Sequence, residues 1–87
     1  MPQDYNEAAK WYQAAVVSGN KRALGPLGAL YAKMGDNVSA HMWFNLAAAA
    51  DDRSAAEYRD AVAKRMTPAQ IVEAQKLARQ WDTKQNR

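Results

Sequence analysis

The chain contains two related segments that lie 32 residues apart. Aligned at that spacing, residues 4–35 and 36–67 share seven identities, and one of these is the pair of Trp11 and Trp43. The shared core is A-x-x-W-[YF]-x-x-A, which places its named residues at i, i+3, i+4 and i+7, as on one face of an α-helix. A repeated helical unit of this length predicts an α-solenoid, in which each unit buries its apolar face by stacking on its neighbour.

The apolar periodicity predicts five helices, and none of the chain has the alternation of a strand. The expected helices cover about residues 4–17, 20–34 and 38–50, a fourth that begins after Asp51 or Asp52 and runs to about residue 66, and a fifth over about 68–81. The residues expected to face the core are Tyr5, Ala8, Tyr12 and Ala15; Leu24, Leu27, Tyr31 and Met34; Ala40, Trp43, Phe44 and Ala47; Ala55, Tyr58, Val62 and Met66; and Ile71, Ala74, Ala78 and Trp81. Because they share a repeat position, Trp11 and Trp43 are expected to occupy equivalent, largely buried sites.

Several residues mark the expected helix ends. A glycine suits the left-handed conformation that ends many helices, and the chain has one after each helix of the first pair, Gly19 and Gly35. The segment Thr67-Pro68-Ala69-Gln70 has the pattern of a capping box. Asn20 is expected to cap the second helix, and either Asp51 or Asp52 the fourth. Pro26 is expected to kink or divide the second helix, because proline cannot donate a backbone hydrogen bond.

These signals predict an all-α domain over residues 1–82. It would comprise a helix-turn-helix repeat over 4–35, a second over 36–66, a capping helix over 67–82 and a frayed tail over 83–87. Alanine fills 19 of the 87 positions and favours helix. The chain has no cysteine, which excludes a disulfide framework, thiolate metal ligation and thiol catalysis.

The repeated segments resemble a known family. DYNEAAKWYQAAVVSGNKRALGPLGALYAKMG and DNVSAHMWFNLAAAADDRSAA resemble the Sel-one-like repeat, a relative of the tetratricopeptide repeat. The closing segment RDAVAKRMTPAQIVEAQKLARQW is similar to the C-terminal end common in bacterial members. The resemblance spans roughly residues 2–81 and implies an α-α superhelix that acts as an adaptor or scaffold for a protein or peptide partner.

The residues themselves supply little for catalysis. The one histidine, His41, has no evident nucleophile partner and is expected to be a partly exposed helix residue, while Asp51 and Asp52 suit a helix start. We therefore expect a non-catalytic protein with no metal and no cofactor. In helical repeats of this type the first helix of each pair lines the concave face. The candidate partner-binding residues there are Asn6, Lys10, Gln13, Met42 and Asn45.

Two other classes of function stay open at this stage: a self-assembling structural protein, and a binder of small molecules or nucleic acid. An open N-terminal end carrying Tyr5, Trp11 and Tyr12 predicts a homodimer. Lys and Arg number 12 and Asp and Glu 9, and the two signs are interleaved, which does not favour nucleic acid. No segment has the length of a membrane span or the pattern of a signal peptide, so the chain as given is expected to be cytoplasmic, with export open if the sequence is truncated.

Overall fold

The computed structural model describes residues 4–85, which form five α-helices and one short 3₁₀ turn. In chain order these are α1 (Tyr5–Val17), η1 (Lys21–Ala23), α2 (Leu24–Lys33), α3 (Asn37–Ala49), α4 (Arg53–Ala63) and α5 (Pro68–Gln85). No strand occurs between residues 4 and 85, so the predicted all-α class is confirmed for the described part of the chain.

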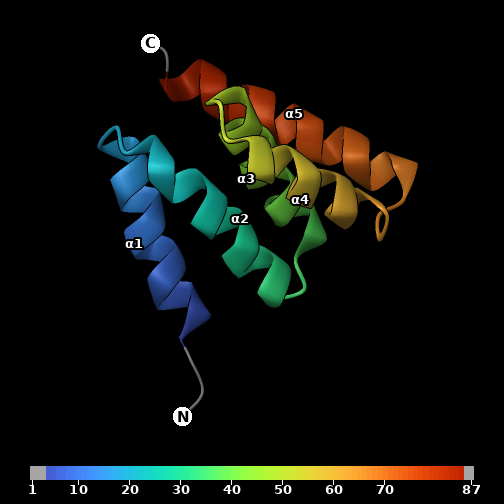
Figure 1. The fold of residues 1–87 in the computed structure, drawn as a ribbon, viewed down its shortest axis with the longest axis horizontal. Coiled ribbons are helices and arrows are strands. Elements are labelled where there is room, and N and C mark those ends of the chain that lie inside the picture. Colours follow the sequence, from blue (N-terminus) through green and yellow to red (C-terminus); the bar gives the residue numbers. More distant parts are fainter. Residues whose placement is uncertain (1–3, 86–87) are drawn as a thin grey trace.

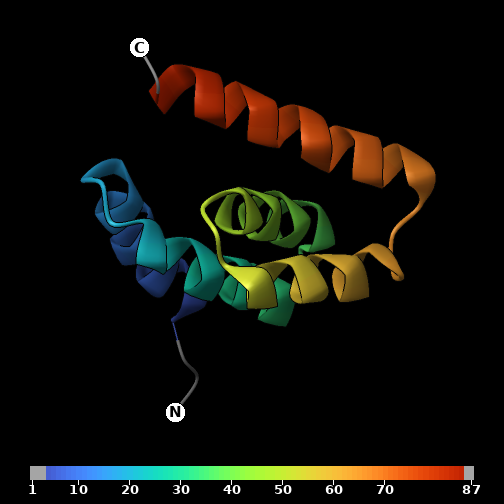
Figure 2. The same ribbon diagram turned by 45° about the horizontal axis from the view of Figure 1, so that its top comes forward.

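Helix α3 lies at the centre of the molecule (Figure 1). It packs against α2, α4 and α5, whereas α1 packs against α2 and η1. Figure 2 views α3 nearly along its axis and shows it between α5 on one side and α2 with α4 on the other. Because α5 packs mainly on α3 and does not extend the row beyond α4, the stacked superhelix stays a prediction.

Three of the helices begin with an aspartate that caps the helix N-terminus. In each of three cases an aspartate carboxylate accepts a hydrogen bond from the backbone N–H three residues later, which satisfies an N–H that has no partner inside the helix. The pairs and their N to Oδ1 distances are Glu7 with Asp4 at 3.0 Å, Ser39 with Asp36 at 3.1 Å and Ala55 with Asp52 at 3.2 Å. Asp52 is therefore the cap of α4, which decides between the two residues, Asp51 and Asp52, that the sequence offers for this cap.

The expected capping box at the start of α5 is confirmed. The N–H of Gln70 donates to Oγ1 of Thr67 at 3.1 Å, and the N–H of Thr67 donates to Oε1 of Gln70 at 2.9 Å. Gly19 and Gly35 end their helices with φ of 101° and 82°, as predicted. Asp51, the repeat counterpart of Gly19, has a φ of 71° after α3. The turn is therefore retained even where glycine is replaced.

Pro26 divides the second expected helix, as its ring chemistry predicts. Asn20 caps η1 by accepting from the N–H of Arg22 at 3.1 Å, and α2 begins only at Leu24. Pro26 is the third residue of α2, where a backbone N–H would have no partner inside the helix. The division thus removes the cost that proline would impose inside one continuous helix.

The repeat motif of α3 forms the middle of the core. Its four residues Ala40, Trp43, Phe44 and Ala47 are all buried, as predicted. Gly28 of α2 lies directly over the ring of Phe44, and a Cβ on Gly28 would come within 2.7 Å of that ring. A glycine is therefore required at this crossing for α2 and α3 to approach each other.

The same motif in α1 is not buried, and the prediction for Trp11 is wrong. Trp11 is 71% exposed and Tyr12 is 38% exposed, against 3% for Trp43. The residue of α1 that enters the core is Ala9. The physical reason is the number of neighbours, since α3 is enclosed by three helices and α1 packs on one side only. Tyr58, also expected inward, is exposed on α4.

Helix α5 is longer than the sequence predicts. It ends at Gln85, so the expected end at residue 81 or 82 is wrong. Ala74 and Ala78 are buried as predicted, and Trp81 is half-buried beside α3. The remainder of the expected frayed tail, residues 86–87, lies outside the described residues.

Candidate binding site

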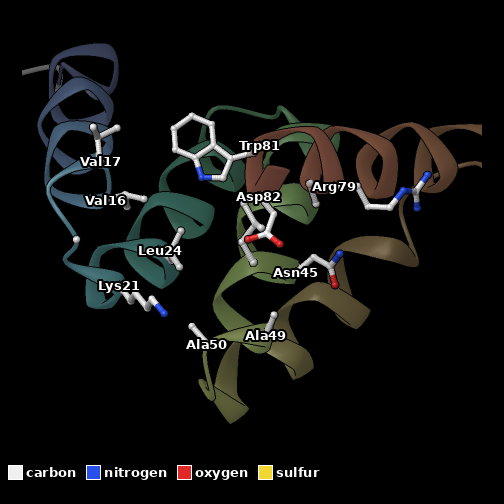
Figure 3. A pocket seen from close by; sticks show the side chains of 13 residues that line it. Val16, Val17, Lys21, Leu24, Asn45, Ala49, Ala50, Arg79, Trp81 and Asp82 are labelled. Atoms are coloured by element: carbon white, nitrogen blue, oxygen red, sulfur yellow. The ribbon is translucent and has the colours of Figure 1, made fainter. Parts of the chain in front are cut away.

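A hollow of about 450 Å³ opens where the C-terminal parts of α1, α3 and α5 converge. We call it the three-helix hollow. It is lined by Val16, Val17, Gly19, Lys21, Leu24, Asn45, Leu46, Ala49, Ala50, Ala78, Arg79, Trp81 and Asp82. Figure 3 shows Trp81 on one side of it, Val16 and Val17 on another, and Ala49 and Ala50 opposite Trp81. The lining is mostly aliphatic and aromatic, with a few polar groups, which is the usual composition of a ligand site.

The position of Trp81 is fixed by the core. Its ring meets the ring of Trp43 edge to face, with 4.9 Å between ring centroids and 73° between planes. This is a favoured geometry for aromatic pairs, and Trp43 is itself buried. The α3 core therefore holds one wall of the three-helix hollow in place.

A second hollow lies along α5 and shares Trp81 and Arg79 with the first. We call it the α5 groove, and it has a volume of about 830 Å³. It is lined by Met42, Lys76, Leu77, Arg79, Gln80, Trp81 and Lys84. Among these lining residues three are cationic and none is acidic. Since Lys76, Gln80 and Lys84 are spaced four residues apart, they lie on one face of α5.

The structure separates the five predicted binding residues. Met42 lines the α5 groove and Asn45 lines the three-helix hollow. Asn6 and Lys10 are exposed on α1 and line neither one. They share a helix face with Val17, seven residues beyond Lys10, and Val17 does line the three-helix hollow. The predicted face of α1 therefore leads to the hollow at the C-terminal end of that helix.

Two of the five predicted residues connect helices inside the chain. Nε2 of Gln13 donates to the hydroxyl oxygen of Tyr31 at 3.0 Å, which links α1 to α2. Its repeat counterpart Asn45 accepts at Oδ1 from Nη1 of Arg59 at 3.1 Å, which links α3 to α4. These amides hold each helix pair together, so a bound ligand would have to compete with an existing bond at either position.

His41 is buried, and the expectation that it is partly exposed is wrong. It occupies the repeat position of Ala9, and its Nδ1 has no hydrogen-bond partner within the described structure. Burial lowers the pKa of His41 below its ordinary 6.5, and the positive charge of Arg59 lowers that pKa further, while Asp60 acts in the opposite direction. His41 is not among the residues that line either hollow.

This histidine makes stability depend on pH. Because its pKa is lower in the folded state than in the unfolded state, the unfolded chain takes up the proton first as pH falls. The free energy of unfolding should therefore fall as pH is lowered from about 7 to about 5.5, and recover as pH rises through 6.5. Urea unfolding of the wild type and of His41→Leu tests this. An equal pH dependence in the His41→Leu variant would contradict the assignment, since His41 is the one histidine of the chain.

Two searches of the described residues bear on other classes of function. No group of three or more His, Cys, Asp or Glu side chains that could hold a metal ion occurs in the part of the chain that the structure describes. Within the same residues, no helix is both long enough and apolar enough to cross a membrane.

Comparison of the chain with protein-family models, with curated proteins and with solved structures finds no match. The resemblance to Sel-one-like repeats therefore rests on the motifs in the sequence.

Sequence reasoning missed most of the lining of both hollows. The sequence predicts a capping helix over residues 67–82, whereas the packing of α5 on α3 brings Leu77, Arg79 and Trp81 to the site. The available signal was the spacing of Leu77 and Trp81, one helical turn apart and flanked by Lys76 and Lys84. That pattern describes an apolar stripe with cationic borders.

Proposed function

We propose that this chain is a non-catalytic module that binds a peptide segment of a partner protein, with the three-helix hollow as its main site. The observation that carries the proposal is the hollow itself, where three helix ends leave an apolar recess with polar groups around it. A recess of about 450 Å³ can hold one large apolar side chain with part of its backbone.

The α5 groove indicates the charge of the segment that leaves the hollow. Both sites share Trp81 and Arg79, so one extended segment can contact both. The groove combines the apolar side chains of Met42 and Leu77 with the cationic Lys76 and Lys84. A peptide with an apolar anchor and acidic residues beside it is complementary to this surface.

The sequence resemblance supports a binding role, since the family supplies adaptors and scaffolds. The recurrence of aspartate caps 32 residues apart, at Asp4 and Asp36, is in keeping with repeated helix pairs. We therefore propose a fragment of the α-solenoid class in which α5 covers part of α3. In this arrangement the two hollows would be the part of the concave face that stays open to a partner.

A peptide library displayed on phage provides the test. The affinity of peptides selected on the wild type is then measured for the variant Ala49→Trp. Ala49 is exposed at the end of α3, and a tryptophan there would fill part of the three-helix hollow. We expect the affinity to fall at least about tenfold, because the anchor loses its recess. The control is Ala69→Trp, an exposed position on α5 that lines neither hollow, and it should bind like the wild type.

The composition of the selected peptides is a second readout. We expect an apolar residue flanked by Asp or Glu, and affinity that weakens as salt is added. Equal binding to wild type and Ala49→Trp would overturn the proposed site. Selected peptides without any acidic preference would overturn the role of the α5 groove while leaving the three-helix hollow in place.

A further inference from the structure

One face of α1 carries the same motif that is buried against neighbouring helices in α3. In α3 the motif residues Ala40, Trp43, Phe44 and Ala47 are buried in the core, with Phe44 under Gly28 of α2. The counterparts on α1 are Ala8, Trp11, Tyr12 and Ala15, which we call the α1 stripe. The α1 stripe has the composition of a helix-packing surface, yet Trp11 and Tyr12 are exposed.

We infer that the α1 stripe is the contact surface of a two-fold homodimer, in which it packs against the α1 stripe of a second copy. The inference is independent of the proposed peptide site, because no residue of the α1 stripe lines either hollow. Exposed adjacent aromatic side chains on one helix face are a common mark of such a contact.

A head-to-tail arrangement of copies does not fit. In that arrangement the α1 stripe of one copy would pack on α4 of the next copy, in the way that α3 packs on α2 within the chain. The residues of α4 at the positions of Leu27 and Gly28 are Arg59 and Asp60. These two are ion-paired at 3.2 Å. Arg59 is also bonded to Asn45. A charged pair with side chains in place of glycine offers an aromatic ring neither an apolar surface nor the space.

The α1 stripe is complementary to itself when two copies run antiparallel. Ala8 and Ala15 lie about one helical turn on either side of the aromatic pair, so each leaves room for a large ring. A two-fold axis that crosses α1 at the level of Gln13 places Trp11 over the partner's Ala15, and the partner's Trp11 over Ala15. Each pair then repeats the large-on-small packing that Phe44 makes with Gly28.

The charges at the two ends of α1 favour the same orientation. Asp4 and Glu7 lie at its N-terminal end, and Lys21 and Arg22 follow its C-terminal end in η1. All four are exposed. Antiparallel pairing brings the acidic end of one copy beside the basic end of the other, which lowers the energy of that orientation relative to the parallel one.

The expected dimer is weak. Two partly exposed tryptophans and two partly exposed tyrosines bury on the order of 500 Å² together, whereas stable interfaces bury roughly 1,600 Å². We expect a dissociation constant on the order of 100 µM. Because the α1 stripe and the hollows are separate, the dimer presents two peptide sites, which would strengthen binding to a partner with two copies of the segment.

Sedimentation equilibrium from about 5 µM to about 1 mM tests the dimer. The average mass of the wild type should rise from 9.7 kDa toward twice that value. Trp11→Lys should stay at the monomer mass with an unchanged circular dichroism spectrum, since Trp11 is exposed. The control Val72→Lys changes an exposed apolar residue of α5 in the same way and should dimerise like the wild type.

A charge exchange tests the antiparallel orientation. Glu7→Lys should weaken the dimer, and the double variant Glu7→Lys with Arg22→Glu should restore it, because the opposite charges again face each other. A monomer at about 1 mM wild type, or an undiminished dimer in Trp11→Lys, would overturn the inference. A mass that continues to grow beyond the dimer would also overturn it, in favour of head-to-tail assembly.

Discussion

Replacing Trp43 with alanine is expected to lower the free energy of unfolding by about 3–5 kcal/mol, the range for deleting a buried large aromatic side chain. Trp43 is 3% exposed and lies in the core cluster with Phe44 and Leu27. Its edge-to-face contact with Trp81 also joins α5 to α3. Truncation therefore leaves a cavity between two helices and removes a specific contact. Urea unfolding followed by far-ultraviolet circular dichroism measures the loss.

The matched control is Trp11→Ala, which changes the same residue at the same repeat position. Because Trp11 projects into solvent, its truncation should alter the free energy of unfolding by about 0.5 kcal/mol or less, as for other exposed sites. The measurement belongs at low micromolar concentration, where the proposed dimer is dissociated. Similar losses in the two variants would contradict the exposed position of Trp11 and restore the equivalence that the repeat predicts.

Most helix boundaries, though not the end of α5, were predictable because their determinants are local. The capping box of Thr67 and Gln70 needs only four consecutive residues, and the caps at Asn20 and Asp52 need three or four. Pro26 divides the second helix through its own ring chemistry. No distant part of the chain has to be known for these features to form.

The burial of the motif was predictable for α3 and not for α1. Both helices present an Ala, an aromatic pair and a second Ala on one face, so their periodicity is the same. What differs is which neighbours the fold supplies. Phe44 meets Gly28, whereas Tyr12 is 38% exposed within the part of the chain that the structure describes. A pattern that predicts an apolar face does not identify the element that covers it.

The candidate site was predictable only in part for the same reason. Met42 and Asn45 were selected as exposed positions of a first helix, and each lies in one of the two hollows. Trp81 was assigned to a core stripe, and Lys21 was given no role. Both line the three-helix hollow because of contacts between elements distant in sequence. The packing of α5 on α3 decides these positions, and no short motif encodes that choice.

Replacing Gly28 with valine is expected to cost about 3 kcal/mol of stability, at the upper end for overpacking of a core. A Cβ at this position would lie 2.7 Å from Cδ1 of Phe44, and the methyl groups of valine extend further. The ring cannot move away easily, because Phe44 is 3% exposed and lies among the core residues of α3. Valine has a slightly better helix propensity than glycine, by a few tenths of a kcal/mol, which does not offset the clash.

Two further variants separate the clash from an effect of valine on the helix. Ala29→Val introduces a β-branched residue at the next, exposed position of α2 and should change stability by about 0.5 kcal/mol or less. Phe44→Ala alone should cost about 3–5 kcal/mol. In the double variant the valine occupies space that the ring has left, so the combined loss should be smaller than the sum of the single losses by about 1 kcal/mol or more. Additive losses would show that Gly28 and Phe44 do not meet, and would remove the α2–α3 crossing as the template for the α1 stripe.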